Sequence, residues 1–263
     1  MTPALHDMLD PQTRALYVRT LEILNDSGVP YLVGGAYAFA RYTGIERHTK
    51  DFDVFVRPED ARPALDVLAA AGYQTDMTFP HWLGKAFMGE DFIDVIFGAG
   101  NNVARVDDRW FEHARDDLVL GVPVKLIPAE EMVWSKGYIM ERERFDGADI
   151  AHVLRACADR LDWDRLLERF GPHWRVLLTH LVLFGFIYPG ERQRIPARVL
   201  RPLLARAAAE GDEDGSVCGG TLLSRQQYLT DIGHWDYADA RLVHGHMTPQ
   251  DIAHWTAAIE GKH

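Results

Sequence analysis

The most constraining feature of the sequence is the stretch TKDFDVFV, residues 49–56, in which acidic and apolar side chains alternate. This alternation predicts a strand, because successive side chains of a strand point to opposite faces. Asp51 and Asp53 then leave the strand on one face, while phenylalanine and valine pack on the other. Two like charges this close repel each other, so the acidic face either meets solvent or holds a metal ion.

The first half of the chain alternates between helical and strand patterns. Apolar periodicity and flanking glycines predict helices over residues 11–27, 36–44 and 58–71. Short apolar or alternating runs predict strands at 31–33 and 51–56, and strand pairs within 85–98 and 118–128, around tight turns at Gly89-Glu90 and Gly121.

After Pro128 the pattern becomes helical. Helices are predicted over 129–145, 147–161, 163–170, 173–188 and 197–210, and a last helix begins after an N-cap at Thr248. The apolar stretch 174–188 contains Arg175 and His180 and is shorter than the roughly 20 residues that cross a bilayer. We therefore interpret it as a buried helix, and we expect an α+β chain with domains at 1–128 and 129–263.

Composition restricts the classes of function. The 263 residues are 47% hydrophobic and carry a net charge of −11, which argues against a general nucleic-acid coat because phosphate binding needs a basic surface. Five arginines within 192–206 form a local basic segment, which either contacts RNA or, more simply, is a solvated helix face. Cys157 and Cys218 form no CxxC motif, and the N-terminus resembles no signal peptide, so we expect a cytoplasmic protein.

Two further features accompany the acidic strand. Gly34-Gly35 lies between a predicted strand and a predicted helix, where glycines let a phosphate approach the backbone and the helix N-terminus offers free N–H groups. Asp94 lies in the apolar strand DFIDVIF, where an unpaired carboxylate is costly to bury. Each feature has a plain alternative, a turn or a structural partner, but together they suit Mg²⁺, which prefers carboxylate oxygens and phosphates.

The order of these motifs resembles the nucleotidyltransferases of the DNA polymerase beta superfamily, and in particular the AbiEii-like bacterial proteins of uncertain acceptor. The matching residues are Gly34-Gly35-Ala36, Arg47, Thr49, Lys50, Asp51, Asp53 and Asp94. The block 126–154 is similar to the helical segment that follows the core in those proteins, with Lys136 and then Asp146 or Asp149 at its polar positions. The resemblance covers about residues 30–155 and is silent on 170–260.

The resemblance implies a polymerase-beta-type catalytic core at 1–128 and a helical domain at 129–263 that completes the nucleotide site and recognises the acceptor. It implies Mg²⁺-dependent transfer of an NMP from an NTP to a hydroxyl, with release of pyrophosphate. The implied roles are metal binding by Asp51, Asp53 and Asp94, proton uptake by Asp94, phosphate binding by Gly34 and Gly35, charge compensation by Lys136, orientation by Asp149, and secondary nucleotide contacts by Thr49 and Lys50.

The implied partners are an NTP and an acceptor that is tRNA, a protein or a small molecule, without a membrane. A protein partner such as an antitoxin also fits the resemblance. Two other functions stay open at this point. One is a non-catalytic nucleotide-binding module of the same fold, and the other is a DxD metal-dependent glycosyltransferase, which the glycine pair and Asp94 fit less well.

Overall fold

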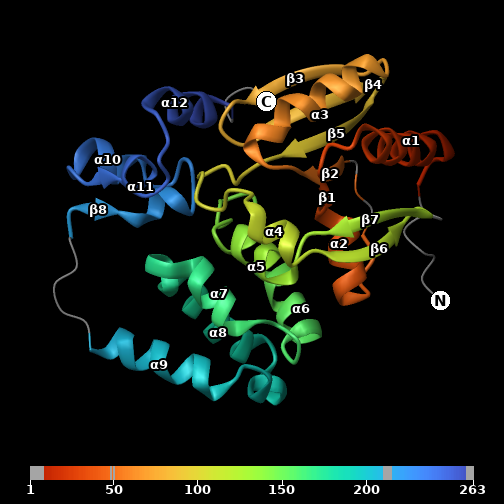
Figure 1. Ribbon diagram of the computed structural model, residues 1–263. Coiled ribbons are helices and arrows are strands. Elements are labelled where there is room, and N and C mark those ends of the chain that lie inside the picture. Colours follow the sequence, from red (N-terminus) through yellow and green to blue (C-terminus); the bar gives the residue numbers. More distant parts are fainter. Residues whose placement is uncertain (1–8, 48, 50, 210–214, 259–263) are drawn as a thin grey trace. The chain divides into compact units, whose positions relative to one another are not determined.

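The computed structural model describes residues 9–47, 49, 51–209 and 215–258 (Figure 1). The chain divides into two compact units, Met1–Pro128 and Ala129–His263. The helices of the first unit are α1 (Pro11–Ser27), α2 (Gly35–Thr43), α3 (Pro58–Ala70) and α4 (Asp108–Glu112). Its strands are β1 (Leu32–Val33), β2 (Asp51–Phe55), β3 (Gln74–Phe79), β4 (Leu83–Met88), β5 (Asp91–Ile96), β6 (Arg115–Val119) and β7 (Val122–Leu126).

These seven strands form one mixed sheet in the order β3-β4-β5-β2-β1-β7-β6. The strand β2 lies parallel to β5 and antiparallel to β1, while β1 lies parallel to β7. In the β2–β5 register Asp53 is the direct partner of Asp94. Since paired residues on neighbouring strands point to the same face, the sheet places these two carboxylates side by side.

Helices α1 and α2 begin and end where local chemistry favours it. The Asp10 carboxylate caps α1 by accepting hydrogen bonds from the N–H groups of Gln12 and Thr13. Gly28 and Gly44 end the two helices in the left-handed conformation, with φ of 72° and 71°. The N-terminus of α2 follows Gly34, which has no side chain to cap it.

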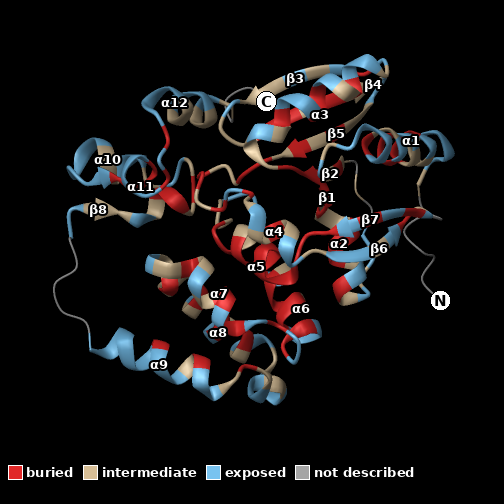
Figure 2. Cartoon of the chain, in the orientation of Figure 1, coloured by how far each residue is buried: buried red, intermediate tan, exposed pale blue. Residues whose placement is uncertain are grey.

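The core of the first unit lies behind the acidic strand. Phe52 is fully buried, and its ring lies 4.8 Å from the rings of both Tyr17 on α1 and Tyr37 on α2, measured between centroids. Asp51 and Asp53, which alternate with Phe52, are only half-buried. Figure 2 shows the same contrast between the buried centre of the sheet and the exposed sides of its helices. The predicted alternation of β2 is therefore confirmed.

Two elements of the first unit were not predicted, β3 and α4. The strand β3, QTDMTF, contains few apolar residues, because it lies at the edge of the sheet and exposes Gln74 and Asp76. The helix α4 has five residues, too few for a periodic pattern. The two predicted strand pairs are confirmed, with Met88 opposite Asp91 in one hairpin.

The second unit is mainly helical. Its helices are α5 (Ala129–Gly137), α6 (Gly147–Cys157), α7 (Trp163–Phe170), α8 (Trp174–Ile187), α9 (Ala197–Ala208), α10 (Leu229–His234), α11 (Ala240–Val243) and α12 (Pro249–Ala257). Short 3-10 helices are η2 (Gly171–His173), η3 (Pro189–Arg194) and η4 (Gly219–Leu222), and β8 (Val217–Cys218) pairs with β9 (Ala238–Asp239). The α+β fold class, a mixed sheet with helices followed by a helical region, is confirmed.

The predicted helix over 129–145 is wrong beyond Gly137. After α5 the chain turns back on itself, and Met140 and Phe145 form an antiparallel bridge. The N–H of Glu141 donates to the carbonyl of Arg144 at 2.8 Å, which closes the turn. The charged run ERER therefore lies in a turn and not on a helix face.

One stretch of the described residues, Trp163–Ile187, is long and apolar enough to cross a membrane by length and composition alone. This is weak evidence, because the core helix of a soluble protein gives the same signal. The stretch is interrupted by the 3-10 turn Gly171–His173, and α8 packs one side into the second unit, where Leu177 and Phe184 are fully buried.

Candidate active site

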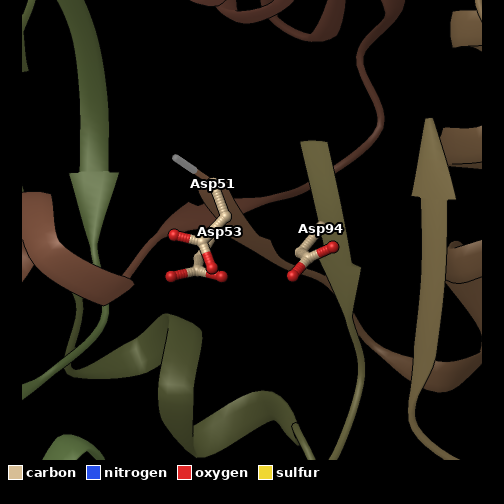
Figure 3. Close-up of side chains that lie close together, drawn as sticks. All are labelled: Asp51, Asp53 and Asp94. Atoms are coloured by element: carbon tan, nitrogen blue, oxygen red, sulfur yellow. The ribbon is translucent and has the colours of Figure 1, made fainter. Parts of the chain in front are cut away.

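Three carboxylates gather on one face of the sheet. Asp51 and Asp53 extend from β2, and Asp94 extends from the neighbouring β5 (Figure 3). Each offers one oxygen, and these oxygens all lie within 4.8 Å of one another. All three side chains are half-buried, so a ligand can reach them. The sequence predicted the first two on one face, and the pairing of β2 with β5 brings the third beside them.

The glycine pair lies directly beside the second aspartate. The N–H of Gly34 donates to the backbone carbonyl of Asp53 at 3.0 Å. Gly35 has a φ of +53°, and a Cβ atom built on it would overlap Oδ2 of Asp53. Only glycine fits both the left-handed backbone and this close approach. The N-terminus of α2, whose first N–H groups have no acceptor within the helix, therefore begins next to the carboxylates, and helix N-termini of this kind bind phosphate groups.

The segment before β2 supports the first aspartate. The Oγ1 hydroxyl of Thr49 donates to Oδ1 of Asp51 and contacts its backbone carbonyl at 3.1 Å. This hydrogen bond orients Asp51. Among the described residues, Thr49 forms no hydrogen bond with Asp53 or Asp94. Lys50, the other predicted neighbour of the site, lies outside the described residues.

Lys85 is a residue of this site that the sequence analysis missed. Its Nζ donates to Oδ1 of Asp94 at 2.6 Å, and it lies 4.1 Å from the ring centroid of Phe92. A signal for it was present, because the tight turn at Gly89-Glu90 sets the register of the hairpin and places Lys85 directly opposite Asp94.

The electrostatics of the site reflect crowded negative charge. Burial raises the pKa of Asp94, the hydrogen bond and charge of Lys85 oppose this rise, and the charge of Asp51 adds to it. Burial, together with the charge of nearby aspartates that include all three site carboxylates, raises the pKa of Tyr17 to about 12. When the three carboxylates are ionised, their negative charges outnumber the single positive charge of Lys85 within this group of four side chains. A set of hard oxygen donors with this excess charge fits a divalent cation such as Mg²⁺.

The predicted lysine and aspartate of the second unit form a cluster of their own. Nζ of Lys136 lies 2.5 Å from Oδ2 of Asp146 and 2.9 Å from Oδ2 of Asp149. Burial raises the pKa of Asp146, but the hydrogen bonds and charges of Arg144 and Lys136 outweigh it, so the pKa lies below its ordinary value. Lys136 and Asp149 are thus brought together with each other, and their contact with nucleotide stays a prediction.

Two of the five arginines in the basic segment 192–206 form ion pairs with acids of their own unit. Arg194 bonds Glu191 at 2.7 Å, and Arg198 bonds Asp164 at 2.8 Å. Arg206 lies over the ring of Trp174, 4.6 Å from its centroid. These contacts favour the simpler interpretation of a solvated helix face over an RNA-binding surface.

No family model matches the chain, and no curated protein matches it. Similar solved structures include the antibiotic-resistance factor ANT(2'')-Ia in solution, with 17% identity, a TM-score of 0.47, and coverage of 65% of this chain and 98% of that chain. The lincosamide antibiotic adenylyltransferase LnuA with lincomycin bound has 14% identity, a TM-score of 0.39, and coverage of 55% and 96%. Both are weak similarities, so we base the function of this chain on the geometry of its carboxylate site.

Proposed function

We propose that this protein is an Mg²⁺-dependent nucleotidyltransferase, which moves an NMP from an NTP to an acceptor hydroxyl. The observation that carries the proposal is the meeting of Asp51, Asp53 and Asp94 within 4.8 Å of one another, at the N-terminus of a helix that begins with a glycine fitted against Asp53. Phosphoryl-transfer enzymes need carboxylates for cations and backbone N–H groups for phosphate, and both are present on one face of the sheet, around Asp53.

Each group of the chain has a role in the proposed reaction. Asp51 and Asp53 bind the cations, and the N–H groups at the start of α2 bind the triphosphate. Asp94 binds the cation that lies nearer the acceptor, and it takes the proton of the acceptor hydroxyl. The hydroxyl oxygen bonds to the α-phosphorus, the bond from the α-phosphorus to the bridging oxygen breaks, and pyrophosphate leaves. Bound Mg²⁺ supplies Lewis-acid stabilisation of the charge on the attacking and leaving oxygens.

The finer parts of the proposal follow the resemblance to AbiEii-like proteins. Residues 1–128 are the catalytic core, and residues 129–263 complete the nucleotide site through Lys136 and Asp149 and recognise the acceptor. Lys50 and Thr49 make secondary nucleotide contacts. ATP is among the NTPs to test, the acceptor is tRNA, a protein or a small molecule, and an antitoxin is a candidate partner. The proposed location is the cytoplasm.

Transfer of label from each α-³²P-NTP in the presence of Mg²⁺ tests the function. The acceptors are bulk tRNA, cell protein and small hydroxylated molecules, aminoglycosides and lincosamides among them. The variant Asp53→Asn removes one carboxylate of the site, while Asp116→Asn removes the carboxylate of a side chain that is 89% exposed on β6. We expect Asp53→Asn to reduce transfer by roughly two orders of magnitude, and Asp116→Asn to leave it unchanged.

The outcomes separate the competing functions. Label that depends on Asp53 but not on Asp116 supports nucleotidyl transfer, and the size of the labelled product identifies the acceptor class. Mg-NTP binding that needs Asp53, with no label in any pool, indicates the non-catalytic nucleotide-binding module instead. If Asp53→Asn changed neither Mg-NTP binding nor transfer of label, the proposal would be overturned.

A further inference from the structure

Lys85 places a positive charge on a carboxylate that the proposed function assigns to a metal ion. Its Nζ lies 2.6 Å from Oδ1 of Asp94, and the two side chains are 22% and 13% exposed. A divalent cation bound to Asp94 would therefore lie close to the ammonium, in a partly desolvated place where charge repulsion is stronger than in bulk water. The Asp94 carboxylate therefore binds a divalent cation more weakly while it is paired with the ammonium of Lys85.

The ammonium has other favourable positions within reach of its side chain. It lies 4.1 Å from the centroid of the Phe92 ring, which attracts a cation through its π face. On its other side β4 pairs with β3, where Asp76 is the direct cross-strand partner of Lys85. Asp76 is on an edge strand and its carboxylate accepts a hydrogen bond from Thr78 at 2.9 Å. Lys85 can thus leave Asp94 and remain beside a π face and a second carboxylate.

We propose that Lys85 is a resident counter-cation of Asp94, which weakens the binding of a divalent cation at this carboxylate until nucleotide is bound. The inference rests on the proposed function, because it requires the three carboxylates to bind divalent cations. Lys85 is a positioning residue, since it acts through Asp94 and not on the reacting atoms. The negative charge of an arriving triphosphate offsets the repulsion, so the site becomes complete only when nucleotide is bound.

Binding of Mn²⁺ to the protein without nucleotide tests this role of Lys85, with free Mn²⁺ followed by electron paramagnetic resonance. The variants Lys85→Met and Lys85→Gln remove the charge, and Lys85→Arg keeps it. The control Lys125→Met removes a lysine whose side chain is 55% exposed on β7, beside Asp116. We expect the neutral Lys85 variants to bind Mn²⁺ about tenfold more tightly or to bind one more ion, since a unit charge repels a divalent cation by at least this factor at such distances.

Further variants connect the effect to Asp94 and to nucleotide. In an Asp94→Asn background Lys85→Met should change Mn²⁺ binding no more than Lys125→Met does. With a non-hydrolysable nucleoside triphosphate bound, the difference in Mn²⁺ affinity between wild type and Lys85→Met should become smaller. Lys85→Arg should bind Mn²⁺ as the wild type does. Far-ultraviolet circular dichroism establishes that each variant is folded before it is titrated, and Lys85→Gln replaces Lys85→Met where the latter is unfolded.

The result that overturns the inference differs from the result that overturns the proposed function. Unchanged or weaker Mn²⁺ binding by the neutral Lys85 variants refutes the role of Lys85 and leaves the metal site in place. Equal Mn²⁺ binding by wild type and Asp53→Asn, with and without nucleotide, refutes the metal site and the inference with it.

Discussion

The substitution Gly35→Ala tests whether α2 must begin in direct contact with Asp53. Gly35 has a φ of +53°, and an added Cβ would overlap Oδ2 of the Asp53 carboxylate. The left-handed backbone alone costs an alanine about 1–2 kcal/mol. The overlap adds a separate cost. It is relieved only when the Asp53 carboxylate moves away from the carboxylates of Asp51 and Asp94.

Gly44 offers a matched control at the opposite end of the same helix. Its φ is +71°, and a Cβ built on it meets nothing within 4 Å. The variant Gly44→Ala therefore carries the same backbone cost, about 1–2 kcal/mol, without the overlap. The difference between the two variants isolates the contact with Asp53.

Urea unfolding, Mn²⁺ binding and transfer of α-³²P label are measured on both variants. We expect both variants to lose free energy of unfolding, and Gly35→Ala to lose more, because the overlap with Asp53 adds to the backbone cost. Only Gly35→Ala should weaken Mn²⁺ binding, by about tenfold, and reduce transfer by about a hundredfold, which is the effect of displacing a reacting group by about 1 Å. Equal Mn²⁺ binding and transfer by the two variants would show that the close approach of Gly35 to Asp53 has no part in the site.

Two further predictions concern stability in the second unit. Glu131 is fully buried and accepts hydrogen bonds from Arg165 at 2.5 Å and Arg169 at 2.9 Å, so Glu131→Gln should lower the free energy of unfolding by about 3–5 kcal/mol. Arg198→Ala breaks an exposed ion pair and should lower it by less than about 1 kcal/mol. Comparable losses for the two variants in urea unfolding would contradict this ranking. Burial lowers the pKa of His180, so below about pH 6.5 the unfolded chain binds a proton that the folded chain does not, and stability falls as pH falls. The urea midpoint should therefore drop less between pH 7.5 and 5.5 in His180→Gln than in wild type, and equal drops would rule out His180 as the group responsible.

Local sequence patterns were sufficient for most elements of the first unit. The apolar periodicity, Pro11 and Gly28 define α1, which begins at Pro11 and ends before Gly28 as predicted. The alternation in β2 correctly places Phe52 in the core and its two aspartates on the open face. These elements follow from the sequence because their signals are local, a few residues apart in the chain.

The wrong predictions arise where contacts between segments distant in the chain decide the structure. The strand β3 has a weak pattern of its own and is held by pairing with β4, so only tertiary pairing makes it a strand. The segment 138–145 has helix-forming residues, but contacts with residues 223–224 hold it as a turn. The N–H of Met140 donates to the carbonyl of Leu223 at 3.1 Å, and the hydroxyl of Ser224 donates to Glu141 at 2.7 Å. In both places contacts with other segments outweigh local propensity.

The candidate site divides along the same line. Period-two alternation is a property of the chain itself, so Asp51 and Asp53 had to share a face once β2 formed. The turn at Gly89-Glu90 equally sets Lys85 opposite Asp94. Neither pattern says which strand lies beside β2. That choice depends on the parallel pairing of β2 with β5 across about forty residues of chain, which is stabilised by the burial of both strands in one sheet. The meeting of the three carboxylates is therefore a property of the folded sheet, and the excess negative charge that suits a divalent cation exists only there.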